Sequence, residues 1–134
     1  MAETLELEVA TPERELVREQ VSEVQVPAAQ GYLGVLPGHA PLLGLLGIGT
    51  LTYNVGGNKR HISIHGGFLE ILEDHVRVLA DVAERAEEID IQRAKAALER
   101  SQREALNPAL GVDPAEALAA TMRAEARLAT AEKK

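Results

Sequence analysis

Arginines in the C-terminal third of this 134-residue chain are the side chains best spaced to hold an anion. Arg93 and Arg100 stand seven residues apart and therefore share one face of a helix. Arg123 and Arg127 stand four residues apart and share another face, with no carboxylate three or four residues from either. A helical hairpin would bring the two faces together as a cationic cage for phosphate. The alternative is a solvated face with no ligand.

No set of side chains is arranged for catalysis or for metal binding. The four histidines have neither a carboxylate nor a second histidine at a spacing typical of metal ligands, so we expect no metal site. We expect no catalytic residue either, because no Ser-His-Asp arrangement can be assembled. His61 and His65 alternate with Ser63 and are interpreted as the polar face of a strand. His39 is either the cap of a chain corner or a docking contact.

Two glycine-rich runs, 31–38 and 44–49, do not match the patterns that bind phosphate. Neither ends in Gly-Lys-Ser/Thr, and neither places Gly-x-Gly-x-x-Gly between a strand and a helix. We interpret these glycines as turns. The chain has no cysteine, which excludes disulfides and thiolate chemistry.

Charge is distributed unevenly along the chain, whose net charge is −7 at pH 7. Residues 1–84 hold five Lys or Arg against twelve Asp or Glu, whereas residues 85–134 hold nine of each. This balance argues against nucleic-acid binding, which requires a cationic surface. No apolar run approaches the roughly 18 residues of a membrane span, and the start of the chain is no targeting signal. Contact with a membrane would therefore require partners.

Short alternating segments predict an all-β region that ends near residue 84. The clearest strands cover residues 4–9, 24–26, 50–55, 68–72 and 76–80. Gly56-Gly57 predicts a two-residue hairpin turn after the third of these strands. That turn places Leu51 opposite Ile62 and makes one face of the hairpin apolar. Strands without helices between them favour an antiparallel sandwich or barrel.

Residues 90–132 favour two helices and a loop. Residues 90–106 are strong helix formers without Gly or Pro, and residues 107–111 interrupt them. Asp113, Pro114 and Glu116 fit an N-cap, a first helical position and a reciprocal N3 carboxylate, so a second helix runs from there to about residue 132. The predicted fold class is α+β, with an N-terminal antiparallel β-sandwich over residues 1–86 and a C-terminal antiparallel two-helix hairpin over residues 87–134.

The apolar surface of the predicted hairpin is mostly alanine. Its larger members are Leu98, Leu106, Leu118, Met122 and Leu128. Burial is worth roughly 25 cal/mol per Å², so an alanine seam holds two helices together less strongly than a leucine seam. We therefore expect a movable arm that can leave the sandwich without unfolding it.

Residues 31–42 combine glycine and proline with large aliphatic side chains, and read Gly-Tyr-Leu-Gly-Val-Leu-Pro-Gly-His-Ala-Pro-Leu. Such an apolar segment predicts a corner pinned to a core or to a partner. The run resembles the signature of the epsilon subunit of bacterial and chloroplast F-type ATP synthases. Runs at 66–71, 78–81 and 83–87 resemble the same family, and the resemblance covers almost the whole chain in order.

The resemblance implies a non-catalytic rotor subunit of the central stalk, which couples ion-driven rotation of the c ring to ATP synthesis. It implies that the sandwich binds the gamma subunit and the c ring. The implied docking residues are Gly31, Tyr32, Leu33, Gly34, Pro37, Gly38, His39, Pro41 and Leu42. Many relatives carry an acidic residue at the position of Tyr32, so apolar burial would replace a polar ring contact here. The chain would lie at the cytoplasmic face of the bacterial plasma membrane, attached only through the complex.

The resemblance also implies that the two helices act as a brake on ATP hydrolysis. Folded down they permit rotation, and extended along gamma they reach the catalytic alpha and beta subunits. The basic residues that would meet acidic catalytic-subunit surfaces are Arg123, Arg127, Lys133 and Lys134.

Residues 89–94 resemble the Ile/Leu-Asp-x-x-Arg-Ala motif by which some bacterial epsilon subunits bind ATP. In that motif ATP is a regulatory ligand and not a required cofactor. Asp90 would meet the adenine amino edge, and Arg93 would hold the nucleotide beside Ile89 and Ala94. The further implied contacts are Glu84, Arg100, Arg123 and Arg127. The alternative is a free-standing nucleotide sensor with the same sandwich and hairpin but no rotary partner.

Overall fold

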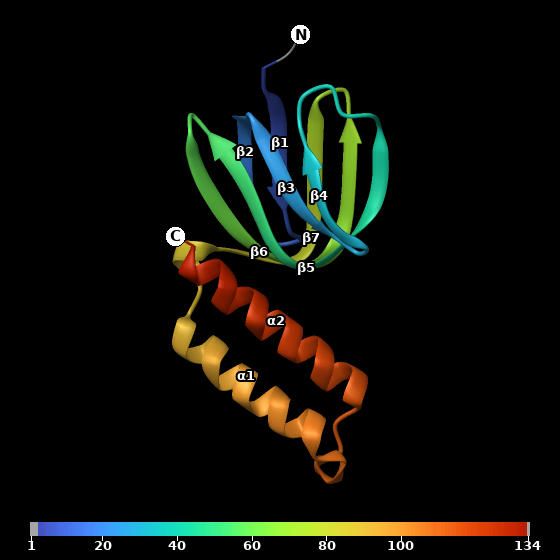
Figure 1. The fold of residues 1–134 in the computed structure, drawn as a ribbon, viewed down its shortest axis with the longest axis vertical. Helices are drawn as coiled ribbons and strands as arrows, with labels where there is room; N and C mark the ends of the chain where they lie inside the picture. Colours follow the sequence, from blue (N-terminus) through green and yellow to red (C-terminus); the bar gives the residue numbers. More distant parts are fainter. Residues whose placement is uncertain (1–2, 134) are drawn as a thin grey trace.

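The computed structural model describes residues 3–133, and Figure 1 shows a curled sheet with two helices packed below it. The strands are β1 (Leu5–Ala10), β2 (Glu15–Val21), β3 (Glu23–Ala28), β4 (Gly31–Val35), β5 (Leu42–Val55), β6 (Asn58–Leu72) and β7 (His75–Arg85). The helical elements are η1 (Ala86–Glu88), α1 (Ile91–Leu106), η2 (Pro108–Leu110) and α2 (Pro114–Glu132). The α+β fold class, with a sandwich followed by a helical hairpin, is confirmed.

The seven strands are hydrogen-bonded in the order β2-β1-β7-β6-β5-β3-β4. All neighbours are antiparallel except β1 and β7, which are parallel. No tight turn joins these two strands, since five others lie between them in the chain, and their relative direction is therefore free of a hairpin's constraint. The sheet is mixed at this one pair. Its inner face holds the core, in which Leu7, Leu51 and Ile64 are fully buried.

The β5–β6 hairpin has the predicted register, with Leu51 opposite Ile62. Gly56 and Gly57 form its turn with φ values of 56° and 83°. The alternation of inward and outward side chains along β6 shifts by one residue at Gly66 and Gly67, whose φ values are 70° and 121°. Before this point Ile64 is in the core, and after it Leu69 is in the core, so β6 continues around the curled sheet with its apolar residues inside.

Two strands were not expected from the sequence. β2 lies in a mostly charged segment, but its Leu16, Val17 and Val21 are buried while its charged side chains are exposed. β4 occupies residues 31–35 of the segment interpreted as a corner, and the turn itself is confined to residues 36–41, before β5 begins at Leu42.

The interpretation as turns is wrong for Gly31 and Gly34, which lie within β4, and for Gly44, Gly47 and Gly49, which lie within β5. Among the glycines of the two runs, Gly38 alone lies in a turn. A Cβ at Gly49 would lie 2.5 Å from the hydroxyl oxygen of Tyr32, and a Cβ at Gly47 would lie 2.8 Å from the carbonyl oxygen of Ala28. The last two glycines therefore permit a close approach of neighbouring strands.

Both helices begin where the sequence predicted. Asp90 caps α1 by accepting from the Arg93 amide, and Asp113 caps α2 by accepting from the Ala115 amide. The reciprocal bond expected of Glu116 is replaced by an ion pair with Arg123.

The seam between α1 and α2 is made of small residues. The buried residues that face it include Ala94, Ser101, Ala117 and Ala124. Ser101 accepts a hydrogen bond of 2.8 Å from Thr121. The larger apolar residues expected there are mostly outside it, since Leu106, Leu118 and Met122 are exposed and Leu98 and Leu128 are half-buried. Close packing of the small residues leaves no room in the seam for them.

Candidate nucleotide site and docking surface

Helix α2 is seated on polar residues of β5 and β6. The hydroxyl oxygens of Thr50 and Thr130 lie 2.7 Å apart, and both side chains are buried. Ser63 and His65 lie beside them and are also buried, with Ser63 Oγ 3.0 Å from His65 Nε2. The polar strand face inferred from the sequence is thus covered at Ser63 and His65, because the hairpin folds back on it.

His65 carries an unsatisfied polar atom at this seat. Its side chain is 5% exposed, and Nδ1 has no hydrogen-bond partner. The pKa of His65 is lowered to about 4, mainly by burial, and the nearby Arg127 and Arg123 guanidiniums contribute in the same direction. His65 is therefore neutral at neutral pH, and a proton on it would be disfavoured while α2 is seated.

A hollow of about 370 Å³ lies where α1, α2, β7 and η1 meet. Its lining contains six of the eight residues predicted to contact ATP. These are Glu84, Asp90, Arg93, Ala94, Arg100 and Arg127. The structure thus brings Arg93 and Arg100 of α1, Arg127 of α2 and part of the 89–94 motif to one place. The other two predicted residues, Ile89 and Arg123, are not in the lining. Ile89 is buried, between the lining residues Glu88 and Asp90 in the sequence.

The arginines expected to lack carboxylate partners have them. Arg127 Nε lies 2.5 Å from Glu84 Oε1, and Arg123 Nη2 lies 2.9 Å from Glu116 Oε1. The first pair joins α2 to β7, and the second spans two helical turns. A search for carboxylates three or four residues away on the same helix therefore misses both. Arg100 pairs with Glu104 at 3.8 Å, one helical turn away on α1.

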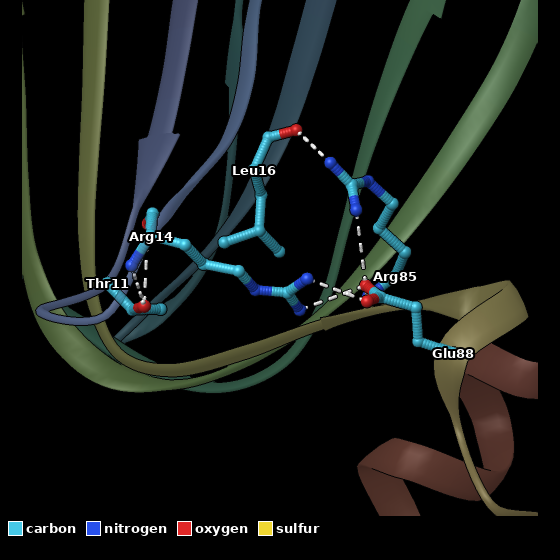
Figure 2. Close-up of polar contacts among 5 residues, drawn as sticks. All are labelled: Thr11, Arg14, Leu16, Arg85 and Glu88. Carbon is cyan, nitrogen blue, oxygen red and sulfur yellow. Dashed lines mark hydrogen bonds and ion pairs between the residues drawn. The ribbon is translucent and has the colours of Figure 1, made fainter.

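The segment that joins the sandwich to the hairpin is held by a cluster of polar contacts, drawn in Figure 2. Glu88 accepts from Arg14 Nη1 at 2.7 Å and from Arg14 Nη2 at 3.0 Å. These bonds are the main cause of a pKa of Glu88 below its usual value. No local sequence pattern indicates this pair, because 74 residues separate its members.

The predicted docking segment forms an accessible edge of the sandwich. Within it Tyr32 and Leu42 are exposed, and the Tyr32 hydroxyl accepts from the Thr50 amide at 3.0 Å. Gly38 has a φ of 86° and donates its amide to Asp74 at 2.6 Å. His39 Nδ1 lies 2.7 Å from the Ala40 carbonyl oxygen, a contact within the turn. The other predicted docking residues are exposed or half-buried: Gly31, Leu33, Gly34, Pro37 and Pro41.

An exposed apolar patch continues from this edge across the outer surface of the sheet. Leu45 of β5, Phe68 of β6 and Leu79 of β7 are direct neighbours in register, and all three are exposed. Leu43 adds to the patch with 75% of its surface exposed. A contiguous patch of large apolar side chains on three strands is typical of a protein contact surface.

Within residues 3–133, no three or more His, Cys, Asp or Glu side chains are grouped so that they could hold a metal ion. Among the helices described here, none is both long and apolar enough to cross a membrane. Lys134, predicted to join the basic C-terminal surface, lies outside the described residues.

Comparison with known proteins places the chain in one family. The family model for the ATP synthase Delta/Epsilon chain β-sandwich domain matches residues 4–86. The ATP synthase epsilon chain of Solibacter usitatus is 95% identical over 134 residues, which is all of both chains. The epsilon chain of Syntrophobacter fumaroxidans is 45% identical over 99% of both chains. A chain in the cryo-EM structure of the Euglena gracilis mitochondrial ATP synthase matches with a TM-score of 0.85 and 26% identity, covering 98% of this chain and 83% of that one. The chain therefore belongs to the family of ATP synthase epsilon chains, the non-catalytic central-stalk subunits of the ATP synthase complex.

Proposed function

We propose that this subunit couples rotation of the c ring to ATP synthesis through two contacts of its sandwich. The apolar patch of Leu43, Leu45, Phe68 and Leu79 binds the gamma subunit, and the edge at residues 31–42 binds the c ring. The observation that carries this proposal is the patch itself, since its large side chains are solvated in the isolated chain. In the bacterial cell this arrangement holds the chain at the cytoplasmic face of the plasma membrane.

The docking experiment is co-purification with gamma. Phe68→Asp puts a charge in the middle of the patch and should abolish binding, because a buried unpaired carboxylate is strongly unfavourable. Leu118→Asp is the matched control, since Leu118 is as exposed as Phe68 but lies on α2. Equal recovery of gamma with both variants would contradict the patch as the docking surface. Purification of the native membrane ATPase without this chain would instead favour the free-standing sensor.

The hairpin is proposed to bind ATP as a regulatory ligand in the hollow of about 370 Å³. Two α1 arginines and one α2 arginine line it, so phosphate oxygens could bridge the two helices. A ligand that bridges them stabilises the folded hairpin over the extended one in proportion to its differential affinity. The extended hairpin, with Arg123, Arg127 and Lys133 on α2 and at its end, would reach the alpha and beta subunits and block ATP hydrolysis.

Calorimetry with the isolated full-length chain tests the nucleotide site. Arg93→Ala or Arg127→Ala should weaken ATP binding about ten- to hundredfold, because a charge-assisted contact is worth roughly 1.5–3 kcal/mol. Glu99→Ala, an exposed residue of α1 outside the hollow, should change the affinity little. The absence of binding heat and of a thermal shift at millimolar ATP would contradict the nucleotide site, and the arginines would then contact only protein or solvent.

A further inference from the structure

The base of the hairpin is tied to a distant turn of the sandwich. Thr11 Oγ1 accepts from the Arg14 amide at 3.3 Å and fixes the turn between β1 and β2. From that turn the Arg14 guanidinium meets the carboxylate of Glu88 with both terminal nitrogens, at 2.7 Å and 3.0 Å. Such a two-bond pair fixes orientation as well as distance. Figure 2 shows Arg14 reaching across to Glu88 in this way.

Arg85 completes the attachment from the other side. Its amide donates to Glu88 Oε1 at 3.0 Å, and its Nη2 donates to the Leu16 carbonyl oxygen of β2 at 2.6 Å. Residues 85–88 are therefore bonded to the β1–β2 hairpin at two points (Figure 2). Asp90, which caps α1, follows only two residues later.

The bonds of Arg14 and Arg85 to Glu88 and Leu16, which we call the clamp, also affect the charge of the nucleotide hollow. Glu84, Glu88 and Asp90 line the hollow together with three arginines, so its lining is balanced before a polyanion enters. Arg14 is not in the lining, yet it pairs with Glu88. The charge of Glu88 is thus neutralised by a cation outside the hollow, and the three lining arginines remain available to a ligand or to the other carboxylates.

We propose that Arg14 and Glu88 are positioning residues of the nucleotide hollow, which hold the linker so that β7 and α1 face each other across it. The clamp also places the pivot of the hairpin directly after Glu88, with residues 85–88 remaining on the sandwich when the helices move. The first part rests on the ATP binding proposed above, and the second does not.

The test uses the full-length chain and two measurements. Arg14→Ala should raise the hydrogen-exchange rate of amides 86–90 about tenfold without nucleotide, and should weaken ATP binding about three- to tenfold; the pair is partly exposed, which limits the effect. Arg18→Ala is the matched control, because Arg18 lies on the same β1–β2 hairpin and pairs only with glutamates of β1 and β2 among the described residues. It should change neither quantity.

Arg14→Lys separates geometry from charge, since it keeps the cation and loses the two-bond fork. Weakened ATP binding and fast hydrogen exchange of the linker in Arg14→Lys would support the positioning role. If Arg14→Ala does not fold, the Arg14→Lys variant takes its place in both measurements. Wild-type affinity and wild-type exchange in Arg14→Lys would overturn the proposal. If the wild-type chain binds no ATP, the proposed nucleotide function fails, whereas the exchange rates still decide whether the clamp holds the linker.

Discussion

Acidification should release the helical hairpin from the sandwich through His65. His65 is neutral while α2 covers it, since burial lowers its pKa to about 4 from the ordinary 6.5. When the hairpin leaves, the imidazole meets water and regains its ordinary pKa. The released state therefore binds the proton more strongly, and protons act as a ligand of that state.

The size and sign of the effect follow from the two pKa values. The contribution of neutral His65 to the stability of the seated state is fully present above pH 6.5, and it is lost progressively as the pH falls from 6.5 towards 4. At pH 5 the equilibrium constant for release should be about 30-fold larger than at pH 8. Other charged groups face the seat: Arg123 and Arg127 of α2 oppose a proton on His65, and Glu84 of β7 is held by Arg127 at 2.5 Å. His61 of β6 also has a lowered pKa, chiefly through burial.

A distance measurement between the two parts decides this prediction. The chain has no cysteine, so dyes can be attached at Lys59→Cys on β6 and Glu125→Cys on α2, which are both exposed. Energy transfer should fall as the pH is lowered from 8 to 5. His65→Gln keeps a partner for Ser63 but cannot titrate, so most of the pH dependence should be lost. His61→Gln should lose less of it, because the pKa of His61 is lowered less than that of His65. Parallel pH curves for wild type and His65→Gln would refute the reasoning.

Two further predictions concern the sandwich alone. A chain that ends after Glu88 should fold as a β protein with a cooperative thermal transition, because every residue of the main core cluster lies between Leu5 and Ala83; an unfolded circular dichroism spectrum would contradict this. Gly67→Ala should destabilise the protein by about 1–3 kcal/mol or more in urea unfolding, since Gly67 has a φ of 121° and its Cβ would collide with the Leu79 carbonyl oxygen. Gly57→Ala, with a φ of 83° and open space around it, should cost less, and equal losses would show that the collision is relieved.

The parts of the fold predicted from the sequence are those fixed by local signals. The Gly56-Gly57 turn sets the β5–β6 register, and Asp113 with Pro114 sets the start of α2. β2 was missed because its buried residues Leu16 and Val17 are adjacent in the sequence and surrounded by charge. Whether such a segment is a strand depends on the pairing of β2 with β1, which no local pattern encodes.

The candidate site shows the same division. The 89–94 motif and the arginine spacing named five residues that line one hollow, and the family resemblance added Glu84. The pairs Arg14–Glu88 and Arg127–Glu84 were not predicted, because 74 and 43 residues separate their members. The burial of His65 was missed for a related reason. Alternation identifies a polar strand face, but it does not tell whether water or a polar helix covers that face.

The outer surface of β5 and β6 has a polar half, which α2 covers, and an exposed apolar half. On one side of the one-residue shift at Gly66 and Gly67 it presents Ser63, and on the other side it presents Phe68. Water can hydrogen-bond to the hydroxyls of the polar half when α2 leaves, so separation costs little there, and the orphaned Nδ1 of His65 even gains a partner. Separation of a partner from the apolar half would expose large side chains at roughly 25 cal/mol per Å². For the proposed function, this difference predicts a lasting contact at the apolar half and a reversible contact at the half that α2 covers.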